Sequence, residues 1–498
     1  MSADKTSYRQ IMKATSIFGG VQVFTIIIAI IRSKFIAILL GPTGMGIYSL
    51  LNSTTSMITS ITSFGLGTSA VKNIAEANGT GNKERVATVA GVFRRLVWFT
   101  GLLGSVSMLV LSSWLSELTF GSKEYTIAFV WISITLLVNQ LTTGNYVILR
   151  GMRKINFMAQ ASLAGSFIGL LVTIPLYYIW GVKGIVPAII ISSFIALFLS
   201  IYFSNKIKID KILLTKTSIV VEGKKMLVMG FMISLTGILD QIIAYVTRLY
   251  IIKQSDIETV GLYNAGFAIV NTYVGMIFTA MLTDYYPRLS AIATDNAMCK
   301  KEINQQAEVA ILILSPIILV FLVFAKFGIV LLYSQKFLGI NEMILWAMLG
   351  VYIKAANWSM GIIVLAKGES LFYFLTYILA TIIMLGSNIA GFYFWGLKGL
   401  GIGFLLSYSL LTIIGLWLFW VRYSFSFTLE FAKIFFIQFG LGLTCFAIVM
   451  YVSNPINFFF GFVLIVISSY FSYRELDKRI GIKQILIDLI KRLKTLNN

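Results

Sequence analysis

Long apolar stretches separated by short polar seams follow one another along most of the chain. A helix needs about 20 mostly apolar residues to cross the hydrocarbon core of a bilayer, and fourteen stretches are that long. The expected spans are 13–38, 45–70, 96–116, 125–149, 155–179, 184–204, 226–252, 261–285, 309–333, 342–366, 370–394, 399–421, 434–452 and 457–473. The pattern predicts an all-α integral membrane protein with about 14 transmembrane helices and no large soluble domain.

The amino-acid composition and the absence of catalytic motifs argue against most classes of enzyme. The chain is 58% hydrophobic and only 12% charged, and it contains no histidine, so histidine-based catalysis and metal ligation are excluded. The two cysteines, Cys299 and Cys445, form no CxxC motif, and neither a Walker A nor a G-x-S-x-G pattern occurs. The sequence therefore predicts a protein that is not an enzyme and that has no metal site and no cofactor.

The net charge of +20 indicates an orientation in the membrane, because lysine and arginine are retained on the cytoplasmic side. With the N-terminus inside, 30 of the 40 basic residues fall into inner seams and tails. Both termini are then cytoplasmic, and no nucleic acid is expected as a partner. Residues 474–498 form a basic amphipathic tail that we expect to lie on anionic lipid, although a solvated helix or a partner-binding segment would show the same pattern.

An internal repeat organises the chain. The motif Trp180-Gly181-Val182-Lys183-Gly184-Ile185 returns 215 residues later as Trp395-Gly396-Leu397-Lys398-Gly399-Leu400, and Gly46-Ile47-Tyr48 returns at the same offset as Gly261-Leu262-Tyr263. Two separated motifs that share one offset indicate a duplication. Since one copy holds six spans, an even number, both copies have the same orientation in the membrane.

The duplication predicts two six-helix lobes, residues 1–210 and 211–425, followed by two extra spans in 426–473 and the tail 474–498. Lobes related by an axis along the membrane normal would enclose a central cavity and could open it to alternate sides by rocking. This is the architecture of a secondary transporter.

Charged side chains inside the expected spans are the candidate functional residues, since each costs several kcal/mol unless it faces protein or water. Five are cations and one is an acid: Arg32, Lys34, Arg248, Lys326, Lys354 and Asp240. Arg32 and Arg248 occupy nearly equivalent places in the two copies. An excess of cations attracts an anion, and arginine engages phosphate through paired hydrogen bonds, so we expect a ligand that carries phosphate.

Each of these residues also has an ordinary structural explanation. Arg32, Lys34 and Arg248 could extend toward the outer interface, and Lys326 could serve only in packing. Lys354 is too central to reach water easily and is the strongest single candidate. Asp240 could balance Arg248, but eight residues on one helix separate them by about 12 Å, so a site for a coupling proton or sodium ion is the functional alternative.

Three groups of residues give the chain a resemblance to a known family. They are Leu40-Gly41-Pro42-Thr43-Gly44-Met45-Gly46, Tyr286-Pro287-Arg288-Leu289-Ser290, and Trp346 with Gly350, Lys354 and Leu365-Ala366-Lys367. They resemble the polysaccharide transporters of the multidrug/oligosaccharidyl-lipid/polysaccharide (MOP) exporter superfamily, and most of all the O-antigen translocases. The likeness covers residues 10–420, whereas the last two spans and the tail depart from the twelve-span members.

The resemblance implies a flippase that moves undecaprenyl-diphosphate-linked oligosaccharide across the bacterial cytoplasmic (inner) membrane, with membrane lipid around it. A polysaccharide polymerase and chain-length machinery would be further partners in such a pathway. Within the superfamily, a multidrug and toxin extrusion (MATE) exporter of cations and a peptidoglycan lipid II flippase are the alternatives. A membrane-bound polymerase or ligase would need a large outer loop, whereas the outer seams here are short.

Overall fold

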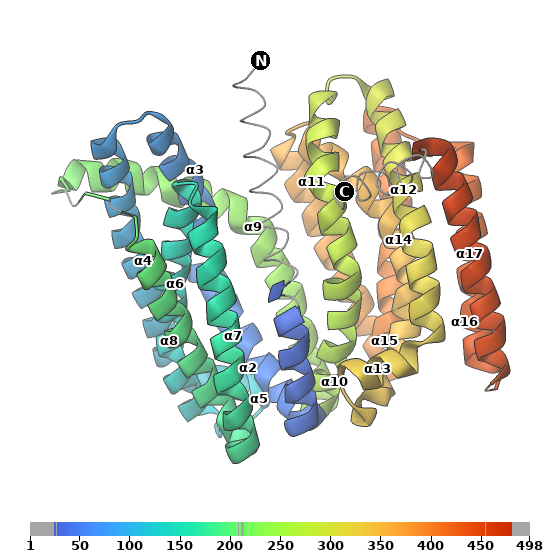
Figure 1. The fold of residues 1–498 in the computed structure, drawn as a ribbon, viewed down its shortest axis with the longest axis horizontal. Coiled ribbons are helices and arrows are strands. Elements are labelled where there is room, and N and C mark those ends of the chain that lie inside the picture. Colours follow the sequence, from blue (N-terminus) through green and yellow to red (C-terminus); the bar gives the residue numbers. More distant parts are fainter. Residues whose placement is uncertain (1–23, 26, 208, 211–213, 454, 481–498) are drawn as a thin grey trace, which may run out of the picture. The chain divides into compact units, whose positions relative to one another are not determined.

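The computed structural model describes residues 24–25, 27–207, 209–210, 214–453 and 455–480, and this part of the chain is helical without any strand. Residues 27–39 form a helix that stops at Leu40, and Gly41 takes a positive φ of 68° before the next helix begins. The α-helices labelled in Figure 1 are α2 (Gly41–Thr62), α3 (Leu66–Gly79), α4 (Lys83–Val110), α5 (Ser112–Phe120), α6 (Thr126–Gly151), α7 (Ile155–Trp180), α8 (Ile185–Ser204), α9 (Lys216–Gln254), α10 (Ile257–Ala268), α11 (Gly275–Ala291), α12 (Asn296–Val323), α13 (Ala325–Leu332), α14 (Asn341–Ala366), α15 (Ser370–Tyr423), α16 (Leu429–Tyr451) and α17 (Ile456–Ile480). Three shorter segments of other helix types lie between them: η1 (Gly181–Gly184), η2 (Ile269–Val274) and η3 (Gln335–Ile340).

Ten helical segments within the described residues are long and apolar enough to cross a membrane. Two of them, Ile155–Ser204 and Ser370–Tyr423, run for 50 and 54 residues and turn back at a glycine, so each supplies two antiparallel helices. The predicted all-α integral membrane class is thereby confirmed. The number of 14 crossings stays a prediction, since it also requires α2 and the helix at residues 27–39 to span.

The backbone has the same conformation at the two turns, which lie at equivalent positions of the sequence repeat. Gly181 has φ 53° and ψ −132°, and Gly396, its counterpart in the second copy, has φ 56° and ψ −139°. A side chain at such angles is strongly disfavoured, which explains why both copies have glycine here. The hairpin helices also meet in the same way, because a Cβ on Gly184 would lie 2.4 Å from the Leu176 oxygen and one on Gly399 would lie 1.7 Å from the Gly391 oxygen.

The second repeated motif makes a close backbone contact between the two copies. A Cβ added to Gly46 would lie 2.0 Å from the carbonyl oxygen of Ile257, and one added to Gly261 would lie 1.9 Å from the carbonyl oxygen of Pro42. Pro42 and Ile257 are themselves 215 residues apart. The two contacts are therefore equivalent, because in each a glycine of one copy meets the corresponding carbonyl of the other copy. Local two-fold symmetry produces such a pair of contacts.

By its internal contacts the chain divides into two compact units, and the border lies at Gly261 rather than at residue 210. The first unit ends at Gly261 and also takes in Leu332–Ser334, and the second comprises Leu262–Leu331 and the chain from Gln335 onward. The border of the units thus differs from the border of the sequence repeat. The lobes 1–210 and 211–425 remain a prediction about the repeat.

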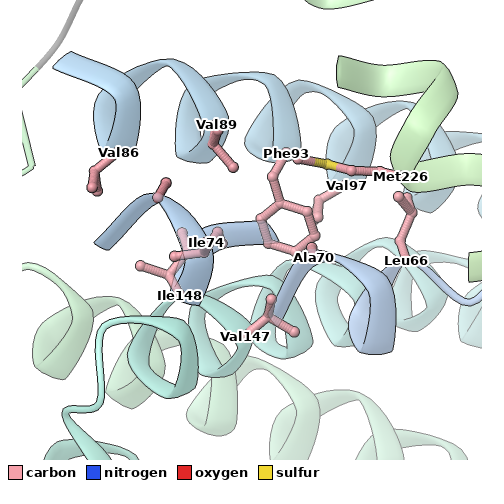
Figure 2. Packing of buried hydrophobic residues seen from close by; sticks show 11 residues of the cluster. Leu66, Ala70, Ile74, Val86, Val89, Phe93, Val97, Val147, Ile148 and Met226 are labelled. Carbon is pink, nitrogen blue, oxygen red and sulfur yellow. The ribbon is translucent and has the colours of Figure 1, made fainter. Parts of the chain in front are cut away.

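Helix α9 is the reason for this difference, because it packs on helices of the first copy. Figure 2 shows Met226 of α9 against Phe93 in the apolar cluster that joins α3, α4 and α6. Near the other end of α9, the buried Tyr245 hydroxyl lies 2.9 Å from the Thr119 hydroxyl of α5. Buried polar contacts of this kind bind membrane helices to one another where apolar contact alone gives little preference.

The two helices that follow the repeat, α16 and α17, form a hairpin that packs on α12 in the second unit. Buried Gln438 of α16 donates to the Ser472 hydroxyl at 2.9 Å and accepts from the Ser468 hydroxyl at 2.7 Å, both on α17. Helix α17 continues to Ile480, so residues 474–480 belong to it rather than to a separate tail. The remaining tail, 481–498, lies outside the described residues.

The strained glycine at the α15 turn provides a test of the repeated hairpin. Replacing Gly396 by alanine should lower stability by about 1–3 kcal/mol, because the alanine Cβ is incompatible with φ 56° and ψ −139°. The midpoint of thermal unfolding in mild detergent measures the loss. Gly386→Ala is the matched control in the same helix, since its Cβ would meet nothing within 4 Å. Equal midpoints for the two variants would contradict the assigned turn.

Candidate functional site

Lys354 lies near the middle of α14 and is surrounded by aromatic rings from two other helices. Its Nζ atom lies 5.5 Å from the ring centre of Phe278 on α11 and 5.6 Å from the ring centres of Phe404 and Tyr408 on α15. All four residues belong to the second unit. No ion pair with Lys354 is formed within the described part of the chain.

The aromatic rings offset only part of the cost of placing this ammonium group in a membrane helix. One cation–π contact is worth about 2 kcal/mol when water is excluded, and the rings supply no negative charge. An ammonium group that no carboxylate neutralises keeps its attraction for an anion. The environment of Lys354 is therefore suited to an anionic group that brings its own hydrogen-bond acceptors.

Further aromatic residues extend the cluster. The Phe404 and Tyr408 rings are 4.8 Å apart, Phe267 of α10 lies 5.9 Å from Phe404, and Trp358 of α14 lies 5.3 Å from Phe278. The π-helix η2 separates Phe267 from Phe278 and rotates the chain between them, a distortion that is frequent at functional sites. The cluster offers flat apolar faces beside a cation.

Arg32, in the helix at residues 27–39, is half-buried in the first unit. Its Nη2 atom lies 3.4 Å from the position that a Cβ on Gly169 of α7 would take, so the absence of a side chain there leaves room for the guanidinium group. Its Nε atom is buried and makes no hydrogen bond with the described residues. Such an unsatisfied donor costs about 1–3 kcal/mol, which an acceptor on a ligand would relieve.

The remaining predicted residues of the first unit are not equally buried. Lys34 and Arg248 are half-buried, and Arg248 donates from Nη1 to the carbonyl oxygen of Ala244 one turn earlier in α9, at 2.8 Å. Asp240, on the same helix, is exposed. Among the described residues no group of three or more acidic, cysteine or histidine side chains could hold a metal ion.

Lys326 differs from its expected position inside a span. Helix α12 ends at Val323, and Lys326 is exposed in the short helix α13 that follows. Lys354, by contrast, lies about 20 Å along α14 from its first residue, at 1.5 Å per residue. The predicted span 309–333 is thus divided between two helices, and Lys326 lies in the shorter one, which has only 8 residues.

Comparison with known proteins gives the chain a family. The family model described as "Polysaccharide biosynthesis protein" matches residues 35–342, which is more than half of the chain. The chain belongs to this family. The resemblance drawn from the sequence motifs is thereby confirmed.

Relatives of this polysaccharide biosynthesis protein include a lipid III flippase of Escherichia coli (strain K12) and one of Shigella flexneri. Each is 21% identical over 349 residues, which cover 69% of this chain and 82% of the relative. Such relatives are transporters of lipids rather than enzymes.

Solved structures share the fold. The lipid II flippase MurJ in an inward closed conformation matches with a TM-score of 0.67 at 17% identity, over 92% of this chain and 99% of that one. An inward-facing MATE transporter of the MOP superfamily matches with a TM-score of 0.65 at 17% identity, over 82% of this chain and 96% of that one. At this identity the likeness shows the fold, that of a multi-pass membrane transporter.

Sequence reasoning selected Lys354 but missed the rings around it. Phe404 and Tyr408 are four residues apart and so share one helix face, which is a usable signal. The chain, however, contains 38 phenylalanines and 23 tyrosines, and many such pairs face lipid. Only the packing of α11, α14 and α15 distinguishes these rings from the others.

A double-mutant cycle tests the contact between Lys354 and its rings. Lys354→Met and Phe404→Leu should show a coupling of about 1–2 kcal/mol in the free energy of unfolding, because either change alone removes the cation–π contact. Denaturation of the single and double variants in detergent measures it. Lys354→Met combined with Phe419→Leu, a buried α15 ring that packs on Tyr423 about 22 Å along the helix from Phe404, is the control and should show no coupling. Equal coupling in both cycles would refute the contact.

Proposed function

We propose that this protein is a flippase that moves an undecaprenyl-diphosphate-linked oligosaccharide, an O-antigen or similar repeat unit, across the bacterial cytoplasmic membrane. It carries out no covalent chemistry. The duplicated halves alternate access to a cationic cavity, and both termini face the cytoplasm. Membrane lipid surrounds the protein, and a polysaccharide polymerase with chain-length machinery would use the exported product.

The observation that carries the proposal is the half-buried ammonium group of Lys354, which lies among three aromatic rings and has no carboxylate partner in the described chain. A lipid diphosphate supplies the missing negative charge. The rings give flat surfaces on which sugars could stack. One cluster thus offers groups for both the phosphate and the glycan of such a substrate.

Cations of the first unit are proposed to bind the same class of ligand. Arg32, with its buried Nε donor unsatisfied, Lys34 and Arg248 are assigned to the diphosphate, for which arginine has suitable paired donors. Lys326 is assigned to the membrane boundary, where an exposed cation attracts head groups before they enter. Asp240 remains the proposed site for a coupling ion.

Two alternatives within the superfamily predict different substrates. A MATE-type multidrug antiporter moves cations and would need embedded acids, but the buried Glu222 and Glu308 are paired with Arg85 and Arg479. A lipid II flippase moves a closely related lipid diphosphate and is therefore separated from this proposal by the glycan alone. The family description, polysaccharide biosynthesis, and the lipid III flippases among the relatives support the proposed polysaccharide precursor.

Single substitutions test the assigned cations. Lys354→Ala and Arg248→Ala should each reduce export of the surface glycan at least tenfold, because a lost charge contact to phosphate costs about 1.5–3 kcal/mol. Export is measured by complementation in a strain that lacks its own flippase, with the amount of protein in the membrane determined in parallel. Normal export by both variants would overturn the residue assignments.

Matched exposed lysines serve as controls. Lys253→Ala lies five residues from Arg248 on the same helix, and Lys336→Ala lies in η3 of the second unit, and both should export normally. Substrate identity is tested separately with the purified protein in proteoliposomes. Transfer of a polyprenyl-diphosphate oligosaccharide without transfer of cationic drugs is the expected result, and the reverse would establish the MATE alternative.

A further inference from the structure

A charged cavity lies in the second unit, where helices α12, α16 and α17 meet. It has a volume of about 1200 Å³ and is lined by the first turns of α12 and α16 and the last turns of α17. Pockets that hold small ligands commonly measure about 300–1,000 Å³, so a larger amphiphile can be accommodated. The cavity is built largely by the two helices that follow the repeat, to which the transport proposal assigns no role.

Basic residues outnumber acids in the lining. Six basic side chains face three carboxylates: Arg288, Lys300, Lys301, Lys433, Lys478 and Arg479 against Glu308, Glu430 and Glu475. Two of the acids are already engaged, since Arg479 pairs with Glu308 at 2.7 Å and with Glu475 at 2.6 Å, and Lys478 also pairs with Glu475. The Arg479–Glu308 pair ties α17 to α12, whereas the two pairs with Glu475 lie within α17.

The lysines that stay uncompensated lie on α12 and α16. Lys300, Lys301 and Lys433 form no ion pair within the described part of the chain, and the third acid of the lining, Glu430, is exposed. Lys301 and Lys433 are also exposed, whereas Lys300 is half-buried. Three lysines against one acid give the open side of the cavity a preference for an anion.

The same cavity has an apolar wall. Val309 of α12, Ile434 and Ile437 of α16, and Phe471 of α17 line it, and Ile437 is 46% exposed even though its helix is apolar enough to cross the membrane. A free inorganic anion gains nothing from such a wall, whereas an acyl chain buries apolar surface against it. The combination fits a molecule with a negative head and a hydrocarbon tail.

We propose that this cavity binds an anionic phospholipid of the surrounding membrane, with its phosphate at Lys300, Lys301 and Lys433 and a chain along Ile437 and Phe471. The site is separate from the cluster at Lys354 and does not depend on the transported substrate. Bound lipid would hold the hairpin α16–α17 against α12, and the lipid would therefore stabilise the second unit.

The chain's own tail is a poorer occupant. Residues 481–498 follow α17 directly, but they contain Lys483, Lys491, Arg492 and Lys494 and only one acid, Asp488. A segment with a net positive charge is repelled by a cavity of the same sign. The charge therefore favours a lipid anion over the tail.

The experiment uses the full-length protein in a mild neutral detergent. Native mass spectrometry counts bound lipid, and thermal unfolding measures stabilisation, after addition of phosphatidylglycerol, phosphatidylcholine or inorganic phosphate. Phosphatidylglycerol should bind and raise the unfolding temperature, while the other two should bind at least tenfold more weakly. Equal effects of phosphatidylcholine would overturn the anion preference, and equal effects of inorganic phosphate would overturn the lipid assignment.

Variants locate the binding. Changing Lys300, Lys301 and Lys433 together to glutamine should weaken phosphatidylglycerol binding by about 100-fold, since each lysine near an anionic lipid contributes about a factor of five. The matched control changes Lys154, Lys253 and Lys336 to glutamine, exposed lysines outside the cavity that remove the same total charge. Equal losses in the two triple variants would show that only net charge matters, and the proposal would fail.

A third full-length variant tests the competing occupant. It carries glutamine at Lys483, Lys491, Arg492 and Lys494 and should bind phosphatidylglycerol within twofold of the unaltered protein. Binding that rises tenfold would mean that the tail had been occupying the cavity, which contradicts the proposal.

Discussion

The proposed transport of an anion depends on the positive charge of Lys354, which lies in an apolar helix and has no acid paired with it among the described residues. Removing an ammonium group from water costs several kcal/mol, and a carboxylate neighbour would be the simplest compensation. Around Lys354 the protein supplies aromatic rings instead, which stabilise the cation through their electron-rich faces but do not cancel its charge. The electrostatic demand stays open, and the anionic ligand proposed for this protein would meet it.

Glycine lets helix backbones approach closely at equivalent positions of the two sequence copies, so the helices of both copies pack in the same way. Gly184 and Gly399 lie against carbonyl oxygens across their own hairpins, while Gly46 and Gly261 do so between the copies. Membrane helices gain little from apolar contact alone, so short backbone distances and a few buried hydrogen bonds determine which helices associate. The same motifs that reveal the duplication in the sequence are therefore the contacts that maintain it.

The sequence predicted what depends on local pattern and missed what depends on packing. Span length, the repeat and the turns at Gly181 and Gly396 follow from apolar runs and glycine, which act over a few residues. The position of Lys326 in a short separate helix did not follow, because hydropathy cannot show that one apolar run is divided between α12 and α13. Nor did the rings at Phe278 and Phe404, which come from helices far apart in the chain, or the packing of α9 on the first copy.

Two sets of basic residues in this chain of net charge +20 differ in their partners, and the difference bears on the proposed selectivity. At helix ends, arginines such as Arg479 and Arg288 are bound by glutamate and aspartate, so they contribute to structure and little to the field. In the middle of α14 the cation has no such partner among the described residues. Because Coulomb energies grow as the effective dielectric constant falls, one uncompensated charge there outweighs several paired ones at the surface. The proposed selectivity for an anion therefore depends on the absence of an acid beside Lys354 in the described chain. Adding a carboxylate there would weaken the selectivity more than removing many surface lysines.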